Sequence, residues 1–177
     1  MKKLLISAGA VAALALTSVP AAAATPSNAA SASVKARIYR PLKLTNTNSQ
    51  GVDFGVIVLS GTTFTGESVT MAADGTMPGS DCGTTSGDLT CSGTTSPATF
   101  NVVGANSTTV KITTDASVTL TGATNGGTLT FAPIAPATVA GSTTGTDFTI
   151  GGKLSGLANT TQDDTYNGSF NVTADYQ

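Results

Sequence analysis

The chain has 177 residues, of which 10% are charged and 5% aromatic, and it contains neither histidine nor tryptophan. Its length is a prior for a single domain. The formal net charge of −2 is too small to indicate an electrostatic partner. The composition therefore argues against a basic nucleic-acid-binding protein and against an acidic disordered tail, and it favours a secreted all-β protein rich in small residues and turns.

Residues 1–24 have the pattern of a secretory signal peptide. Lys2 and Lys3 form the positive start, residues 4–16 form the apolar core, and residues 21–24 are alanines at which cleavage can occur. The alternative is a membrane anchor, but the apolar run is short for a bilayer. We therefore expect export through the inner membrane of a bacterium into the periplasm, with the cleavage site left open among the four alanines.

The first segment after this leader with a strand pattern is residues 32–44. Apolar and polar side chains alternate along residues 32–38, so an extended chain would present one apolar edge and one basic edge. Pro41 interrupts the pattern, because proline has no backbone N–H with which to hydrogen-bond to a neighbouring strand. The segment predicts two short strands joined by a break, and the first of them is free to pair elsewhere.

Residues 52–59 are apolar on both parities, which predicts a central strand of the core. Gly55 within this run indicates a bulge or a close approach of two backbones. Farther on, residues 73–97 are long, polar and glycine-rich. We expect an ordered loop there, or a small hairpin of its own.

The two cysteines, Cys82 and Cys91, lie within that polar segment. Disulfides form and persist in exported proteins, so a bridge that pins the loop is the expected state. A metal-binding pair is the alternative, but the chain has no histidine and no third cysteine to complete a ligand set.

The rest of the chain continues the same pattern, giving roughly eight to ten short strands in all, with turn residues between them. Outside the leader, no apolar stripe has a helical period. The sequence predicts an all-β fold, an immunoglobulin-like antiparallel β-sandwich. The further strands are expected at residues 67–72, 98–103, 108–113, 117–120, 128–132, 148–154 and 166–176, with a hairpin turn at 125–127 and a loop at 133–146.

Few residues in the sequence could take part in catalysis or in binding a metal or cofactor. Without histidine the commonest general base is missing. Asp163 and Asp164 are the one adjacent acidic pair, and such a pair in a turn is ordinarily solvated, with too few visible ligands for calcium. Gly151 and Gly152 lack the strand–helix context of a phosphate-binding loop. We predict no catalytic residue, no metal, no cofactor, no nucleic-acid partner and no enzymatic activity.

Three stretches together carry a family resemblance. They are residues 34–38 followed by 41–44, residues 52–57 with their Phe-Gly pair, and residues 166–176 with a Tyr-x-Gly opening and a tyrosine near the end. In this order they resemble chaperone–usher fimbrial subunits of the class 5 and archaic, spore-coat-U-like branches. The exported part also looks like a domain-of-unknown-function family of secreted, pilin-like bacterial proteins. The cysteines depart from many such pilins, in which an early strand is linked to a later one.

The resemblance implies a structural subunit of a fimbria or pilus on the cell surface. Such pilins are incomplete sandwiches that lack their last strand. A periplasmic chaperone fills the open groove first, and the N-terminal strand of the next copy, assembled at an outer-membrane usher, then replaces it by β-strand addition. In this chain the resemblance assigns the donor strand to Ala32, Val34, Ala36 and Ile38, and the acceptor groove to Phe170, Val172, Ala174 and Tyr176.

The predicted organisation is therefore a signal peptide at 1–24, an N-terminal extension with the donor strand at 25–40, and a pilin-like domain at 41–177. The alternative is a self-contained secreted or periplasmic β-sandwich that binds a ligand or coats the surface. In that case the N-terminal strand would pair within its own domain. The sequence leaves open whether a fibre subunit would be major or minor, and which receptor it would meet.

Overall fold

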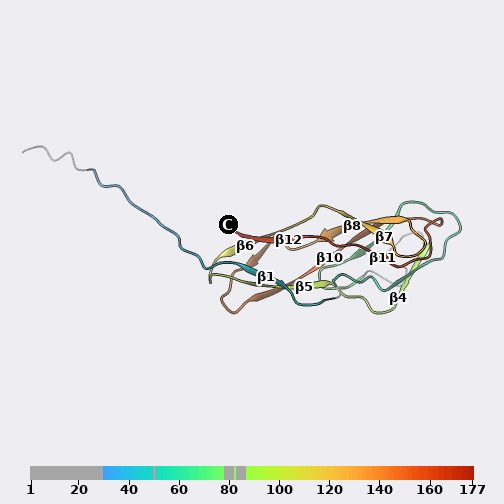
Figure 1. Ribbon diagram of the computed structural model, residues 1–177, viewed down its shortest axis with the longest axis horizontal. Helices are drawn as coiled ribbons and strands as arrows, with labels where there is room; N and C mark the ends of the chain where they lie inside the picture. Colours follow the sequence, from blue (N-terminus) through green and yellow to red (C-terminus); the bar gives the residue numbers. More distant parts are fainter. Residues whose placement is uncertain (1–29, 50, 78–81, 83–86) are drawn as a thin grey trace, which may run out of the picture. The chain divides into compact units, whose positions relative to one another are not determined.

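The computed structural model describes residues 30–49, 51–77, 82 and 87–177; the predicted signal peptide lies outside them. Within these ranges the chain forms twelve strands joined by turns (Figure 1), and every strand pair is antiparallel. The predicted all-β class is confirmed, and the arrangement is that of a β-sandwich-like fold.

The strands follow one another at short intervals along residues 43–176. The first six are β1 (Lys43–Asn46), β2 (Val56–Leu59), β3 (Glu67–Met71), β4 (Leu89–Ser92), β5 (Ala98–Val103) and β6 (Thr109–Thr114). The last six are β7 (Val118–Gly122), β8 (Thr128–Ile134), β9 (Thr138–Ala140), β10 (Thr146–Leu157), β11 (Tyr166–Asn167) and β12 (Val172–Tyr176).

In the part of the chain that the structure describes, these strands form three sheets. The largest has the order β1-β5-β10-β8-β7-β11, with β3 also paired to β10. A second sheet has the order β12-β6-β9, and a third consists of β2 and β4. The hairpin between β7 and β8 confirms the turn predicted at residues 125–127.

The longest strand, β10, joins the two halves of the large sheet. Its first residues, 146–150, pair with β5, whereas residues 151–155 pair with β8 and residues 152–157 with β3. The partner changes at Gly151 and Gly152, and the strand continues through them. A side chain on Gly151 would clash with the carbonyl oxygen of Met71, and one on Gly152 with the ring of Phe131. Glycine is required here because backbone and ring come so close.

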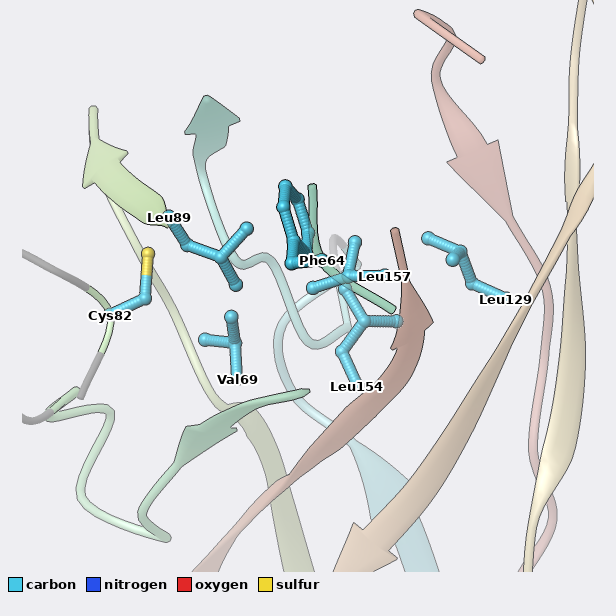
Figure 2. Packing of buried hydrophobic residues seen from close by; sticks show 7 residues of the cluster. All are labelled: Phe64, Val69, Cys82, Leu89, Leu129, Leu154 and Leu157. Carbon is cyan, nitrogen blue, oxygen red and sulfur yellow. The ribbon is translucent and has the colours of Figure 1, made fainter. Parts of the chain in front are cut away.

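Two clusters of buried side chains form the core. Figure 2 shows the first cluster, in which β3, β4, β8 and β10 direct aliphatic side chains toward one another. Its members are Phe64, Val69, Cys82, Leu89, Leu129, Leu154 and Leu157. The second cluster comes from β5, β6 and β10 and consists of Ala98, Phe100, Val102, Val110, Ile112, Phe148 and Ile150.

The central strand predicted at residues 52–59 is wrong. β2 covers only the second half of that run, pairs with β4 alone, and leaves Val56 56% and Val58 48% exposed. The reason is Gly55, whose φ of +70° ends any extended run before β2. A Cβ there would lie 2.6 Å from the Ser92 carbonyl oxygen, so the predicted close approach of two backbones is confirmed.

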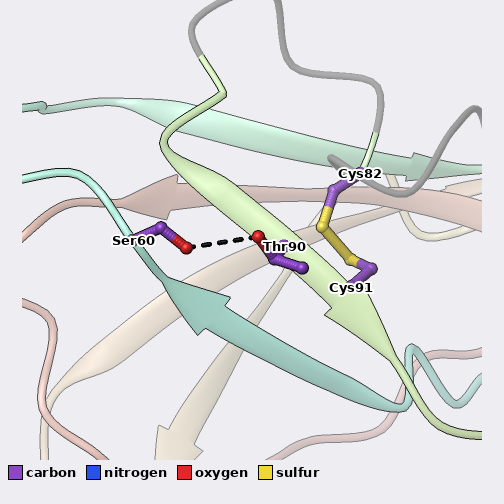
Figure 3. Close-up of a disulfide and its surroundings, with 4 residues drawn as sticks. All are labelled: Ser60, Cys82, Thr90 and Cys91. Atoms are coloured by element: carbon purple, nitrogen blue, oxygen red, sulfur yellow. Dashed lines mark hydrogen bonds between the residues drawn. A yellow bond between two sulfur atoms is a disulfide. The ribbon is translucent and has the colours of Figure 1, made fainter.

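In the described residues of the polar segment 73–97 the strand is β4, and it pairs with β2 and not with a second strand of the same segment. The disulfide between Cys82 and Cys91 is present, with Cα atoms 5.3 Å apart. Figure 3 shows it beside β4, where the hydroxyls of Ser60 and Thr90 lie 3.2 Å apart across the β2–β4 pair. The predicted pinning of this segment by a disulfide is therefore confirmed.

Two further expectations about strands need correction. The final strand predicted at 166–176 is divided into β11, which pairs with β7, and β12, which pairs with β6 in another sheet. The loop predicted at 133–146 contains β9. In both cases the pairing partner determines where a strand forms, because a short polar stretch becomes a strand when a neighbouring strand hydrogen-bonds to its backbone.

Candidate functional site

The C-terminal strand β12 lies at an open edge. It pairs with β6 from Val172 opposite Thr114 to Tyr176 opposite Val110, and no described strand pairs with its other side. β1 likewise ends the large sheet, with β5 as its one described neighbour. Such edges present rows of backbone N–H and C=O groups on which another extended segment can pair.

The four residues predicted to line an acceptor groove share one face of the C-terminal segment. All are partly buried and pack against the second cluster, whereas the residues between them are exposed. Leu42 and Leu44, at the start of β1, also pack against this cluster and are also only partly buried. The second cluster is thus incompletely covered along both open edges. The four residues are Phe170, Val172, Ala174 and Tyr176.

The hydroxyl of Tyr176 joins the end of β12 to the chain just before β1. It accepts a hydrogen bond from the backbone N–H of Ala105 at 2.6 Å and donates one to the carbonyl of Arg40 at 2.8 Å. The ring of Tyr39 lies against the Tyr176 ring, with centroids 4.7 Å apart. A Cβ on Gly104 would come within 2.7 Å of the Tyr176 hydroxyl, so glycine leaves room for this network.

We call Tyr176, with Tyr39, Arg40 and Ala105, the tyrosine clamp. Sequence reasoning placed Tyr176 in the groove wall but missed its hydroxyl contacts. The partners Arg40 and Tyr176 are 136 residues apart, so no local pattern links them. A tyrosine at the last apolar position of a strand, where an aliphatic residue would serve for packing, was the one available signal.

The extension before β1 forms no strand over its described residues, 30–42. Of the predicted donor residues, Val34 is 95% and Ile38 92% exposed, and Ala32 and Ala36 are exposed as well. Val34 and Ile38 are thus large aliphatic side chains that remain almost fully exposed.

A family model describing a domain of unknown function, DUF4402, matches residues 42–176. The chain belongs to this family. The match begins one residue before β1 and ends with β12, so the DUF4402 domain contains every described strand and both clusters. No curated protein and no solved structure matches this chain.

Metal and ligand sites are sparse in what the structure describes of the DUF4402 domain. No group of three or more His, Cys, Asp or Glu side chains is placed there to hold a metal ion. Nor does the described chain contain a helix with the length and apolar character of a membrane span. A small pocket of about 240 Å³ lies beside the clamp and is lined by Arg40, Pro41, Val103, Gly104 and Thr143.

Asp164 of the DUF4402 domain is not simply a solvated turn residue, as the sequence suggested. Its carboxylate accepts backbone N–H groups of Thr124 at 2.8 Å, Asn125 at 2.5 Å and Thr165 at 2.8 Å. Burial alone would raise the pKa of Asp164, but these bonds and that of Gly126 outweigh it, so the pKa lies below its ordinary value. The carboxylate thus closes the turn through backbone groups.

Proposed function

We propose that this protein is a structural subunit of a bacterial surface fibre that polymerises by donor-strand complementation. One observation carries the proposal. A segment with a strand pattern exposes Val34 and Ile38, while β12 has one described neighbour and its apolar face is incompletely covered. The extension has apolar side chains to bury, and β12 has a free backbone edge beside a partly covered apolar face. The extension of one copy can therefore complete the sheet of a second copy.

The two surfaces match in period and length. Donor side chains recur at every second residue over 32–38, and the apolar face of the C-terminal segment recurs in the same way over 170–176. Each stretch spans about 20 Å when extended. The apolar side chains of a strand placed beside β12 would thus pack against the partly buried apolar side chains of the C-terminal segment. Its backbone N–H and C=O groups would form hydrogen bonds with the free edge of β12.

The energies favour association chiefly through two side chains. Full burial of Val34 and Ile38 stabilises the contact by about 1.5–3 kcal/mol each, and Ala32 and Ala36 contribute less. Ladder hydrogen bonds add about 0.5–1.5 kcal/mol each. Because extension and edge are different surfaces of one chain, the contact is head-to-tail and does not close, so it produces a fibre.

The surroundings of the proposed fibre follow from the sequence pattern and the resemblance to fimbrial subunits. The leader would direct export through the inner membrane, a periplasmic chaperone would cover the open edge, and an outer-membrane usher would place the subunits at the surface. Membership in the DUF4402 family leaves these roles open. The proposal assigns the protein no enzymatic activity, cofactor or nucleic-acid partner.

Substitutions on the apolar edge of the extension test the proposal. We expect Val34→Asp or Ile38→Asp to abolish assembly yet leave export unchanged, because each would bury an unpaired carboxylate in the contact. Ser33→Asp is the matched control, since it adds the same charge on the polar edge. Fibres are scored by electron microscopy and by the sedimentation of exported protein.

Normal polymerisation of the Val34→Asp variant would overturn the proposal. If the unmodified protein is a heat-resistant monomer without any partner, the self-contained sandwich becomes the better account.

A further inference from the structure

We propose that the disulfide between Cys82 and Cys91 is a redox-sensitive switch in the DUF4402 domain. When the disulfide is reduced, Cys82 leaves the first cluster and uncovers an apolar surface beside β4, while the second cluster stays folded. The switch is independent of the proposed fibre. It rests on the difference in burial between the two cysteines and on the packing around Cys82.

The two cysteines differ in how easily a small molecule reaches them. Cys82 is 1% exposed, whereas Cys91 in β4 is only partly buried. Cys91, Met77 and Gly93 are among the residues that line a pocket of about 290 Å³. A small thiol that enters this pocket therefore meets Cys91, and not the buried Cys82.

A dithiol is the class of reductant that such a switch requires. Its thiolate attacks Sγ of Cys91, a mixed disulfide forms there, and the bond to Cys82 breaks with Cys82 as the leaving thiolate. The second thiol of the reductant then displaces Cys91. Two electrons pass to the protein, the reductant ends as its own disulfide, and the two protons of its thiols end on the cysteine sulfurs.

The leaving thiolate forms in apolar surroundings. Cys82 packs in the first cluster and lies on the same side of it as Val69 and Leu89 (Figure 2), which are both 0% exposed. A thiolate is disfavoured among aliphatic side chains, because nothing there replaces its hydration. Breaking the bond therefore favours movement of Cys82 toward water.

Little else holds Cys82 in the cluster once the bond is broken. Its φ of +59° lies in the left-handed region, which is unfavourable for a residue with a side chain. The sequence from 79 to 88 has no aliphatic or aromatic side chain that could take its place. Among the described strands β4 pairs with β2 alone, and a two-stranded sheet by itself is only marginally stable. Departure of Cys82 therefore uncovers Val69 and Leu89 and loosens β4.

The second cluster takes no part in this switch. Its members come from β5, β6 and β10 and include neither cysteine. The partly buried side chains that pack against it, among them Val172 and Tyr176, lie outside β2 and β4 as well. The reduced chain therefore keeps this part of the domain folded, and oxidised and reduced copies differ in the apolar surface around β4.

Alkylation of Cys82 tests the proposal, because its rate reports whether the thiol is buried. Cys91→Ala leaves Cys82 as the one thiol of the chain and removes the disulfide without a reductant. We expect iodoacetamide to label Cys82 within about tenfold of its rate in the urea-unfolded variant, whereas a thiol that stayed in the cluster would react at least about a hundredfold more slowly. The unmodified protein treated with dithiothreitol is the second route and should give the same result.

Hydrogen exchange separates a local opening from general unfolding. After reduction, the backbone N–H groups of β2 and β4 should exchange about a hundredfold faster, the factor expected for one short disulfide loop, and those of β5 and β6 at an unchanged rate. Cys82→Ala/Cys91→Ala is the matched control, in which dithiothreitol should change nothing.

Fast alkylation of Cys82 together with faster exchange in β2 and β4 alone supports the proposal. A Cys82 thiol that stays protected, unchanged exchange in β4, or exchange that rises equally in β5 and β6 overturns it. Both measurements are made at a dilution at which size analysis gives a monomer. They can therefore be read even if the unmodified protein forms no fibres, a result that would overturn the proposed function alone.

Discussion

At the residue scale, the polar side chains with the largest structural effect have partners far away in the sequence. Asp164 holds the 124–127 turn through backbone N–H groups that lie 39 and 40 residues earlier. The Tyr176 hydroxyl in the same way joins both ends of the domain. Both residues could be placed on a strand or turn from the sequence, but their partners could not, because only the folded sheets bring them together.

The Asp164 carboxylate gives a pH-dependent prediction. Because its pKa is lower in the folded chain than the ordinary 3.8, its contribution to stability is complete above that pH and is lost as the pH falls through the folded pKa. Asp164→Asn should therefore lower the thermal unfolding midpoint by a few degrees at neutral pH, and the difference should vanish in strong acid. Asp163→Asn removes the same charge and should have little effect. A deficit that persists unchanged in acid would contradict this account.

At the element scale, the fold depends on β10, which pairs with β5 along its first part and with β3 and β8 along its second. Gly152→Ala should place a methyl group against the Phe131 ring and lower the free energy of unfolding by about 1–3 kcal/mol, measured by chemical denaturation. The same substitution in a Phe131→Leu background should cost less, because the smaller side chain gives way. Equal costs in the two backgrounds would show that the ring is not what excludes a side chain.

Local patterns predicted some elements and not others, for a physical reason. Apolar and polar residues alternate over 98–102, and β5 covers the predicted range 98–103. Residues 52–59 are strongly apolar, yet the positive φ of Gly55 and the limited pairing of β2 leave Val56 and Val58 exposed. Apolar content indicates a strand, but only the partners decide whether it is central or peripheral.

At the scale of the whole molecule, the proposed function makes the alternating C-terminal segment and the extension complementary surfaces on one chain. The sequence sufficed to predict which residues occupy the apolar face of residues 170–176, because alternation is a local property. It did not predict that the backbone before β1 is fastened to Tyr176. Under the proposed function, the domain accepts a strand from another copy and the extension is the strand that it donates, with the clamp at the boundary between them.

The most direct measurement of this account is the size distribution of exported protein with and without the residues before Arg40. The account predicts that the complete exported chain forms a series of large assemblies by sedimentation or light scattering. The shortened chain should remain a monomer, because it keeps the open edge of β12 and has no strand to offer. If both forms give the same distribution, whether monomeric or assembled, the extension is not the donor and the account is contradicted.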